Sequence, residues 1–97
     1  TPHIDALAAD GVRFSNGYAS ANVCSPSRAG LMTGRYSIRY GLAWKVVAAN
    51  DTRGLPRSEE TLGELAKRAG YHTKFIGKCH LGGFPDYLRL RHLFDEF

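Results

Sequence analysis

Three glycines each follow a segment in which apolar residues are spaced as in a helix. These helix-terminating glycines limit the possible folds of the chain more than any other feature. Glycine often follows the last turn of a helix, because it adopts left-handed backbone angles without strain. The sequence therefore predicts three helices, which begin near Pro2, Ser25 and Ser58 and end at Gly11, Gly34 and Gly70.

Start signals support the same three helices. Proline is tolerated in a first helical turn, where Pro2 and Pro26 are found, and Ser25 is a candidate N-cap before Pro26. In the third helix, Ser58 and Thr61 are both candidate caps. One apolar face of this third helix is predicted to comprise Leu62, Leu65, Ala66 and Ala69.

Two further segments, residues 12–19 and 71–76, are predicted to be β-strands. Helices that alternate with strands favour an α/β fold, with the helices packed on a mostly parallel sheet. The chain has 97 residues, which is enough for one small domain and too few for two. Because a pair of strands is only marginally stable, we expect either exposed apolar faces or further chain.

Composition excludes several classes of protein. Hydrophobic residues make up 43% of the chain, which argues against disorder. No segment approaches the roughly 20 apolar residues of a membrane-spanning helix. The chain begins without Met and without the pattern of a signal peptide, which suggests a fragment or a processed chain. Its two cysteines do not form a disulfide framework, although they could pair with each other.

The basic residues are unevenly distributed. The net charge is +4, and no acidic residue lies between Asp10 and Asp51 or between Glu64 and Asp86. If the two basic stretches meet in space, they could bind an anionic ligand. The alternative is an ordinary solvated basic surface. The basic residues concerned are Arg13, Arg28, Arg35, Arg39 and Lys45 in the first stretch and Lys67, Arg68, Lys74 and Lys78 in the second.

The segment from Cys24 to Arg28 is the first candidate for chemistry. It places a thiol at a predicted helix N-terminus, where backbone N–H groups favour an anion, and Arg28 could reach the same place. The segment could therefore hold an oxyanion beside a nucleophile. The alternative is a small buried cysteine. A cysteine-dependent phosphatase loop is excluded, because that loop is longer and rich in glycine.

The second candidate is the segment from Gly77 to Gly82, which follows a predicted strand. Lys78 could supply a positive charge to an anion, and His80 could be a general acid or a hydrogen-bond donor. The alternative is a solvated lysine and a histidine bonded to the backbone. A zinc site made by Cys24, Cys79 and His80 has weak support, since no second ligand pair is present. A P-loop is excluded, because no Ser or Thr follows Lys78.

Together these two segments resemble the sulfatase family. Residues 24–35, CSPSRAGLMTGR, are similar to the first sulfatase signature, C-x-P-S-R-x-x-L-x-T-G-R, over its whole length. Residues 70–82 resemble the second signature, which usually ends in G-K-W-H-L-G. Residues 1–14 are similar to the family's T-P-N-I-D-x-L-A-x-x-G-V-x-F, and residues 92–97 to its H-G-F-D-E-F. The resemblance spans nearly the whole chain in order, and is closest to arylsulfatases and steryl sulfatases around residues 35–54.

The resemblance implies part of an alkaline-phosphatase-like α/β fold. Residues 1–97 would be a partial N-terminal catalytic domain of a sulfuric ester hydrolase, incomplete at both ends. In the family, a formylglycine-generating enzyme that recognises C-x-P-x-R oxidises the cysteine to 3-oxoalanine (formylglycine). One hydroxyl of the hydrated aldehyde attacks sulfur, and the second expels sulfate when the aldehyde re-forms. Neither a thiol nor a serine has that second hydroxyl, which explains the modification.

The resemblance also assigns roles to individual residues. The catalytic residues would be Cys24, Arg28, Lys78 and His80, and Lys78 and His80 would also bind the substrate. Cys24, as formylglycine, would contact calcium, and Arg28 would hold its hydroxyls. Lys78 would bind the sulfate and the hydrate, and His80 would hydrogen-bond the formylglycine. The other calcium ligands of the family would lie outside these residues, so we expect this chain alone to be inactive. Two positions depart from the family pattern: Cys79 stands where Trp is usual, and Leu93 where Gly is usual.

The partners implied are a sulfate-ester small molecule or glycan and the formylglycine-generating enzyme, with neither nucleic acid nor a membrane segment. The family also implies the secretory pathway (lysosome, endoplasmic reticulum or extracellular space) in an animal, or the periplasm in a bacterium. Two alternatives remain open. One is a small basic module that binds nucleic acid or sulfated glycans, and the other is a non-functional truncated product.

Overall fold

The computed structural model describes residues 1–48, 50–83 and 93–97. This part of the chain contains three α-helices and one short 3-10 helix, which confirms the three predicted helices. Within the described ranges, no helix combines the length and apolarity needed to cross a membrane. In chain order the elements are α1 (Pro2–Asp10), α2 (Cys24–Thr33), η1 (Ser37–Tyr40) and α3 (Leu62–Arg68).

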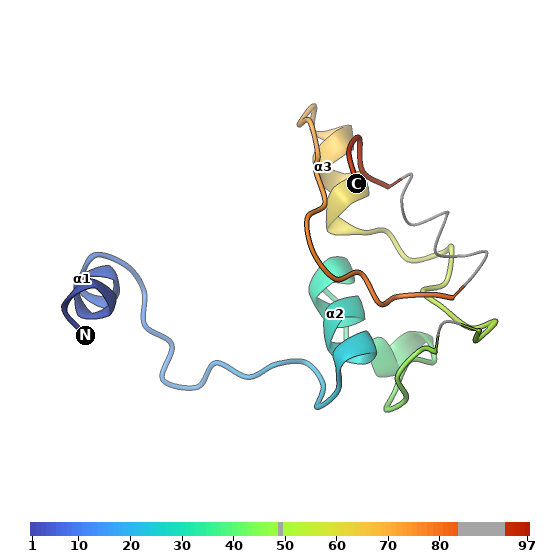
Figure 1. Ribbon diagram of the computed structural model, residues 1–97, viewed down its shortest axis with the longest axis horizontal. Coiled ribbons are helices and arrows are strands. Elements are labelled where there is room, and N and C mark those ends of the chain that lie inside the picture. The colour runs from blue at the N-terminus through green and yellow to red at the C-terminus, as the bar shows by residue number, and fades with distance from the viewer. Residues whose placement is uncertain (49, 84–92) are drawn as a thin grey trace.

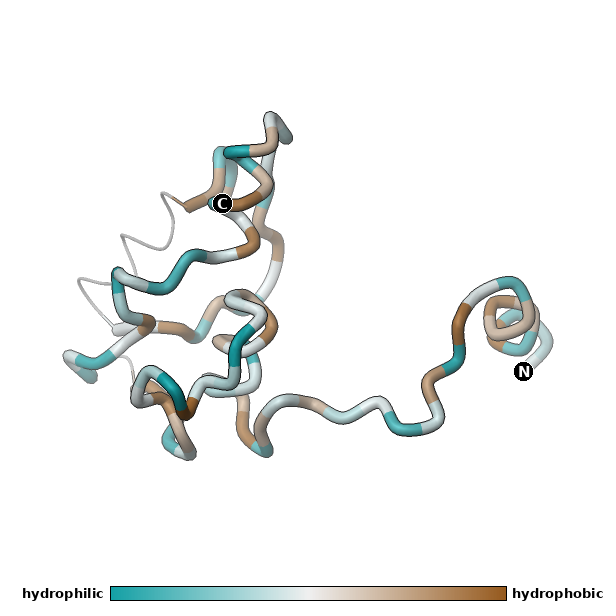
Figure 2. Tube along the Cα trace, turned by 180° about the vertical axis from the view of Figure 1, so that it is seen from behind, coloured by the Kyte–Doolittle hydropathy of each residue, from teal (hydrophilic) through white to brown (hydrophobic). Residues whose placement is uncertain are grey.

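Residues 1–20 form an arm that extends away from the other helices and carries α1 at its end (Figure 1). Every residue of this arm is exposed, and α1 buries none of its side chains. The arm nevertheless carries strongly hydrophobic positions, which Figure 2 shows in brown; Val12, Phe14 and Tyr18 are about four-fifths exposed or more. The Cα radius of gyration, 15.5 Å, exceeds the roughly 13 Å of a compact domain of this size. The expectation of exposed apolar faces is therefore confirmed.

The ends of α2 and α3 follow from local sequence. Gly34 ends α2 in the left-handed region, at φ 65°, and its N–H donates to the carbonyl of Gly30. Thr61, rather than Ser58, caps α3. Its hydroxyl accepts from the Glu64 N–H at 3.3 Å, while the Glu64 carboxylate accepts from the Thr61 N–H at 2.8 Å. This reciprocal capping box satisfies two donors that the first turn of a helix would otherwise leave unpaired.

The predicted apolar face of α3 is not buried. Leu62 is 57% exposed and Leu65 46% exposed, whereas Gly63 is the buried residue of this helix. A Cβ on Gly63 would lie 2.8 Å from two ring atoms of Phe94. Helix α3 therefore packs against the tail through its glycine, and the helical spacing of leucines predicted the wrong side.

A small core joins α2, the loop after η1 and the segment beyond Gly77. The ring of Phe75 lies between two aromatic neighbours, with centroids 5.2 Å from Phe94 and 5.1 Å from Phe97. Such ring pairs add stability beyond the area that they bury. The buried residues of this core are Ala29, Leu42, Val47, Leu55, Cys79, Leu81 and Leu93.

The two predicted strands are wrong for this structure, because no strand forms within the described residues. Residues 12–19 are exposed and make no ladder. Within 71–76, Lys74 forms an isolated parallel bridge with Glu96, and elsewhere Gly54 pairs with Gly82. A strand exists only when a neighbour pairs with it, and the described residues offer each segment at most one bridge. The sheet of the expected α/β fold therefore stays a prediction.

Candidate active site

Cys24 is the first residue of α2 and a free, partly exposed thiol. It lines a pocket of about 300 Å³ together with Ser27, Arg28 and Leu31. These residues share one side of the first two turns of the helix, and none of them is acidic. The predicted placement of a thiol and a guanidinium at a helix N-terminus is therefore confirmed.

Arg28 connects the two candidate segments. Its guanidinium donates a hydrogen bond to the carbonyl oxygen of Lys78, fifty positions further along the chain. The first and second sulfatase-like segments are thus neighbours in space. Lys78 itself is exposed, and neither Lys78 nor His80 is among the residues that line the Cys24 pocket.

His80 has unusual backbone and side-chain surroundings. It is the non-glycine residue with positive φ in the described part of the chain, at 59°. For an L-residue this left-handed conformation costs about 1–2 kcal/mol. Its Nδ1 atom is buried and has no hydrogen-bond partner. Because buried polar atoms are nearly always paired, and because strained residues cluster at functional sites, both features set His80 apart from an ordinary surface histidine.

Cys79 lies between Lys78 and His80 and belongs to the core. Burial raises the pKa of its thiol, although a backbone hydrogen bond from Leu81 and the charge of Arg28 act in the opposite direction. A buried thiol with a raised pKa is a poor nucleophile. The two cysteines, which could have paired, are both free, and they differ in exposure: Cys24 is accessible and Cys79 is buried.

Ser25, next to Cys24, anchors the start of α2. Its side chain is fully buried, and its hydroxyl oxygen accepts from the Val47 N–H at 3.0 Å. The bond ties the loop after η1 to the first helical turn. Sequence reasoning considered Ser25 only as a helix cap, since no pattern indicates its partner twenty-two residues away.

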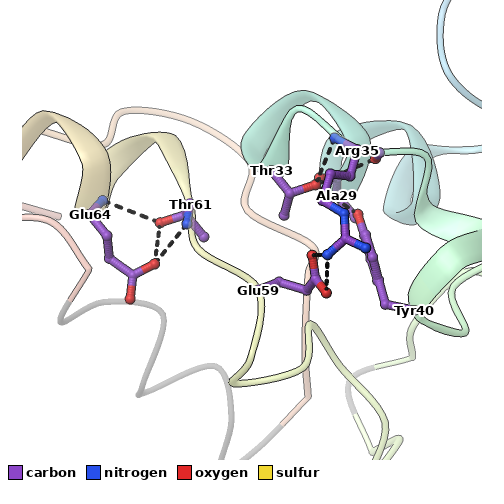
Figure 3. Close-up of polar contacts among 7 residues, drawn as sticks. All are labelled: Ala29, Thr33, Arg35, Tyr40, Glu59, Thr61 and Glu64. Atoms are coloured by element: carbon purple, nitrogen blue, oxygen red, sulfur yellow. Dashed lines mark hydrogen bonds and ion pairs between the residues drawn. The ribbon is translucent and has the colours of Figure 1, made fainter.

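The other end of the first signature is held by an ion pair (Figure 3). Nη1 of Arg35 lies 2.8 and 2.7 Å from the two carboxylate oxygens of Glu59. Glu59 is buried, while Arg35 is half exposed. Beside this pair, the Thr33 hydroxyl donates to the Ala29 carbonyl at 2.8 Å and lies 3.0 Å from the Tyr40 hydroxyl. Burial is the main cause that raises the pKa of Tyr40.

The two basic stretches carry less unpaired positive charge in the structure than their sequence suggests. Many of their cations pair with carboxylates from elsewhere in the chain, including Arg68, whose guanidinium pairs with Glu60. These pairs weaken the hypothesis of a broad anion-binding surface and leave Arg28 as the cation beside the Cys24 pocket. The other paired cations of the two stretches are Arg35 with Glu59, Lys67 with Asp95 and Lys74 with Glu96.

A calcium site is not formed by the described residues alone. No group of three or more His, Cys, Asp or Glu side chains among them could hold a metal ion. Asp5 and Asp10 lie on α1, at the far end of the arm from Cys24 (Figure 1). Calcium takes six to eight oxygen ligands, and these side chains do not supply such a set. The residues present therefore do not fit the ion by themselves.

Comparison with known proteins decides the family. The profile of the family described as Sulfatase matches residues 1–95. This chain belongs to the sulfatase family. N-acetylgalactosamine-6-sulfatase of Homo sapiens is 44% identical to this sulfatase chain over 104 residues, covering 100% of the chain and 20% of the human protein. Arylsulfatase A of Bos taurus is 43% identical over 99 residues, again covering 100% of the chain and 20% of the relative.

The fold of this sulfatase chain also matches a solved structure. The crystal structure of Ps i-CgsB superposes with a TM-score of 0.81 and 35% identity, covering 100% of this chain and 22% of that chain. This likeness shows that the chain shares its fold, over its whole length, with part of that larger protein. The chain spans about one fifth of the length of the curated relatives that it matches.

Proposed function

We propose that these residues form the part of a sulfuric ester hydrolase, of arylsulfatase-like type, that carries its nucleophile at Cys24. The observation that carries this proposal is the hydrogen bond from Arg28 to the Lys78 carbonyl, which joins the two signature segments. Through this bond the N-terminal half of α2 lies beside the segment that carries Lys78 and His80. The relatives named above, all sulfatases, support the same reaction class.

Each side chain has a role that its surroundings support. Cys24 would be oxidised by a formylglycine-generating enzyme, and the resulting aldehyde supplies, once hydrated, the two geminal hydroxyls that a thiol lacks. Arg28, on the same helix face, orients that group and balances negative charge. Lys78 attracts the sulfate as an exposed point charge. The unpaired Nδ1 of His80 is available to exchange a hydrogen bond with the modified residue or the leaving oxygen.

The modification is tested by mass spectrometry on the chain itself. The chain is co-produced with a formylglycine-generating enzyme, and the peptides across Cys24 and Cys79 are compared. We expect Cys24 to lose its sulfur and carry an aldehyde, while Cys79 stays a thiol and serves as the control within the same molecule. Replacement of Arg28 by Ala should reduce the conversion. An intact thiol at Cys24, or conversion at both cysteines, would contradict the proposal.

Activity is tested in a chimera, in which these residues replace the matching N-terminal segment of bovine arylsulfatase A. We expect the chimera to hydrolyse an aryl sulfate, and Cys24→Ala to abolish turnover. His80→Ala should lower the rate by about 100-fold or more, as expected for loss of a proton-transferring group. A folded, modified chimera that is unaffected by either change would refute the assignment.

The isolated 97-residue chain differs from the chimera in its expected activity. We propose that it does not turn over aryl sulfates even with calcium present, because its described residues form no cage of carboxylates. Turnover by the purified chain above that of its Cys24→Ala variant would show this to be wrong. The alternative of a basic nucleic-acid-binding module would instead predict DNA binding with a steep salt dependence.

A further inference from the structure

The loop after η1, residues 41–47, presents an aromatic side chain that the core does not use. Trp44 is the single tryptophan of the sequence, and it is 73% exposed. Leu42 before it and Val47 after it are both buried in the core. The loop is therefore anchored on both sides of Trp44, and it holds the indole outward at a defined place.

The same loop lines a pocket of about 230 Å³, to which Trp44, Lys45 and Arg53 all contribute. Lys45 is exposed and forms no ion pair with any described residue, whereas Arg53 Nη2 lies 2.6 Å from Asp51 Oδ2. The pocket thus combines an aromatic plane with one unpaired positive charge. Because pockets for drug-sized molecules measure about 300–1,000 Å³, this smaller one suits a single ring with an anionic group.

The pocket adjoins the helix turn that carries Cys24. Val47, one of its lining residues, donates from its N–H to the Ser25 hydroxyl at 3.0 Å, so the loop lies beside the first turn of α2 (Figure 1). The two pockets share no lining residue. Since an α-helix with its side chains is about 10–12 Å across, one molecule that occupies both pockets must be longer than a single sugar ring.

We propose that Trp44 and Lys45 form a subsite for a second, anionic sugar ring of an oligosaccharide whose sulfate ester reaches Cys24. This inference rests on the proposed function, because Cys24 defines where the reacting sulfate lies. The indole face offers an apolar plane to the C–H groups of the ring, and the Lys45 ammonium pairs with a sulfate or carboxylate on it. The substrate class is therefore a sulfated oligosaccharide. A nucleic acid strand also has rings and anions, but it carries no sulfate ester for Cys24.

The single tryptophan makes the subsite directly observable. The full chain is titrated with a chondroitin sulfate tetrasaccharide, and the fluorescence of Trp44 is followed. We expect a saturable change in its emission, which the neutral cellotetraose should not cause. No change, or an equal change with cellotetraose or with single-stranded DNA, overturns the proposal. This measurement needs neither formylglycine nor turnover, so its result is independent of the proposed hydrolysis.

Two substitutions and a matched control locate the binding. Lys45→Gln should lower the affinity about two- to fivefold, the range of an exposed ion pair. Arg13→Gln removes the same charge from the exposed arm and should not lower it. Trp44→Ala, followed by the NMR shift of the Val47 amide, should weaken binding about three- to tenfold. An unchanged Val47 amide in the free variants shows that the loop is intact.

The anion that Lys45 binds is identified with the desulfated tetrasaccharide, which keeps its carboxylates. If the effect of Lys45→Gln persists with this ligand, Lys45 pairs with a carboxylate, and if it vanishes, Lys45 pairs with a sulfate. An equal loss of affinity in Lys45→Gln and Arg13→Gln would overturn the subsite, because binding would then follow net charge alone.

The chimera with bovine arylsulfatase A separates this proposal from the proposed function. The tetrasaccharide should inhibit its hydrolysis of an aryl sulfate, and Lys45→Gln should weaken that inhibition about two- to fivefold. An active chimera whose inhibition is insensitive to both Lys45→Gln and Trp44→Ala refutes the subsite and leaves the proposed function standing. A folded, modified chimera without turnover refutes the proposed function, and the fluorescence titration then decides the subsite alone.

Discussion

At the scale of single residues, burial separates side chains that the sequence makes look alike. Cys24 and Cys79 both lie in signature segments, yet one thiol is accessible and the other is in the core. The sequence alone could place both cysteines near the chemistry, because Cys24 belongs to the first signature and Cys79 lies within the segment that resembles the second. It could not tell which thiol is accessible, because burial depends on contacts between residues that are far apart in the chain.

Ser25 provides the first prediction. Ser25→Ala removes the acceptor of the buried Val47 N–H, and such an unpaired group costs about 1–3 kcal/mol. We expect the free energy of unfolding, measured by urea denaturation, to fall by that amount. Ser58→Ala, at an exposed serine, is the matched control and should change the stability little. Equal effects of the two substitutions would show that the buried hydrogen bond is unimportant.

The second prediction concerns the carboxyl group of Asp51. Hydrogen bonds from the Arg53 side chain and backbone lower its pKa to about 2. A lowered carboxyl pKa stabilises the fold above its ordinary value near 3.8, and that contribution is lost as the pH falls towards 2. Carboxyl NMR titration should find the midpoint near 2 and, in Arg53→Gln, a midpoint shifted towards the ordinary value. An unchanged midpoint in the variant would exclude Arg53 as the cause.

At the scale of elements, helices were predicted well and strands poorly. Capping residues and glycines are local signals, so the ends of α1 and α2 could be predicted to within a residue or two. Pairing is not local: residues 71–76 have a strand-like composition, but a single residue of that segment makes a bridge. The buried side of α3 was missed for the same reason, because Gly63 rather than a leucine contacts the tail.

The Arg35–Glu59 pair joins the end of α2 to the segment before α3 and yields an element-scale prediction. Arg35→Ala would leave the buried Glu59 carboxylate without its cation, and we expect a loss of about 1–3 kcal/mol in stability. The double variant Arg35→Ala/Glu59→Gln should recover part of the loss, because the buried charge is gone. Denaturation curves of Arg35→Ala, Glu59→Gln and the double variant measure the coupling, and strictly additive effects would contradict it.

At the scale of the whole molecule, the arm and the body differ in how they are held. Helix α1 makes no helix–helix contact, whereas α2 contacts both η1 and α3. Segments with few buried contacts open at low free energy. The arm carries five large hydrophobic residues that are exposed, so its hydrophobicity gave no indication that it would lie outside the core. A sequence pattern shows which face of an element is apolar, but not which part of the molecule covers that face.

Limited proteolysis tests this division. Chymotrypsin should cut first after Phe14 and Tyr18, which are 78% and 87% exposed, well before it cuts at Phe75 in the aromatic core. Mass spectrometry of early time points would identify the fragments. A protected arm would show that the arm is packed in solution, and simultaneous cleavage at Phe75 would show that the aromatic core is no better protected than the arm.

The close approach of Gly63 to Phe94 has a consequence for engineering this molecule. Replacing a helical glycine with alanine ordinarily strengthens a helix, because the backbone of alanine has less freedom to lose. In α3 the added methyl group would displace an aromatic ring, and with it the tail that carries Asp95 and Glu96. The substitution that improves the isolated helix would thus loosen the molecule around it, and sequence-based optimisation would favour the wrong residue here.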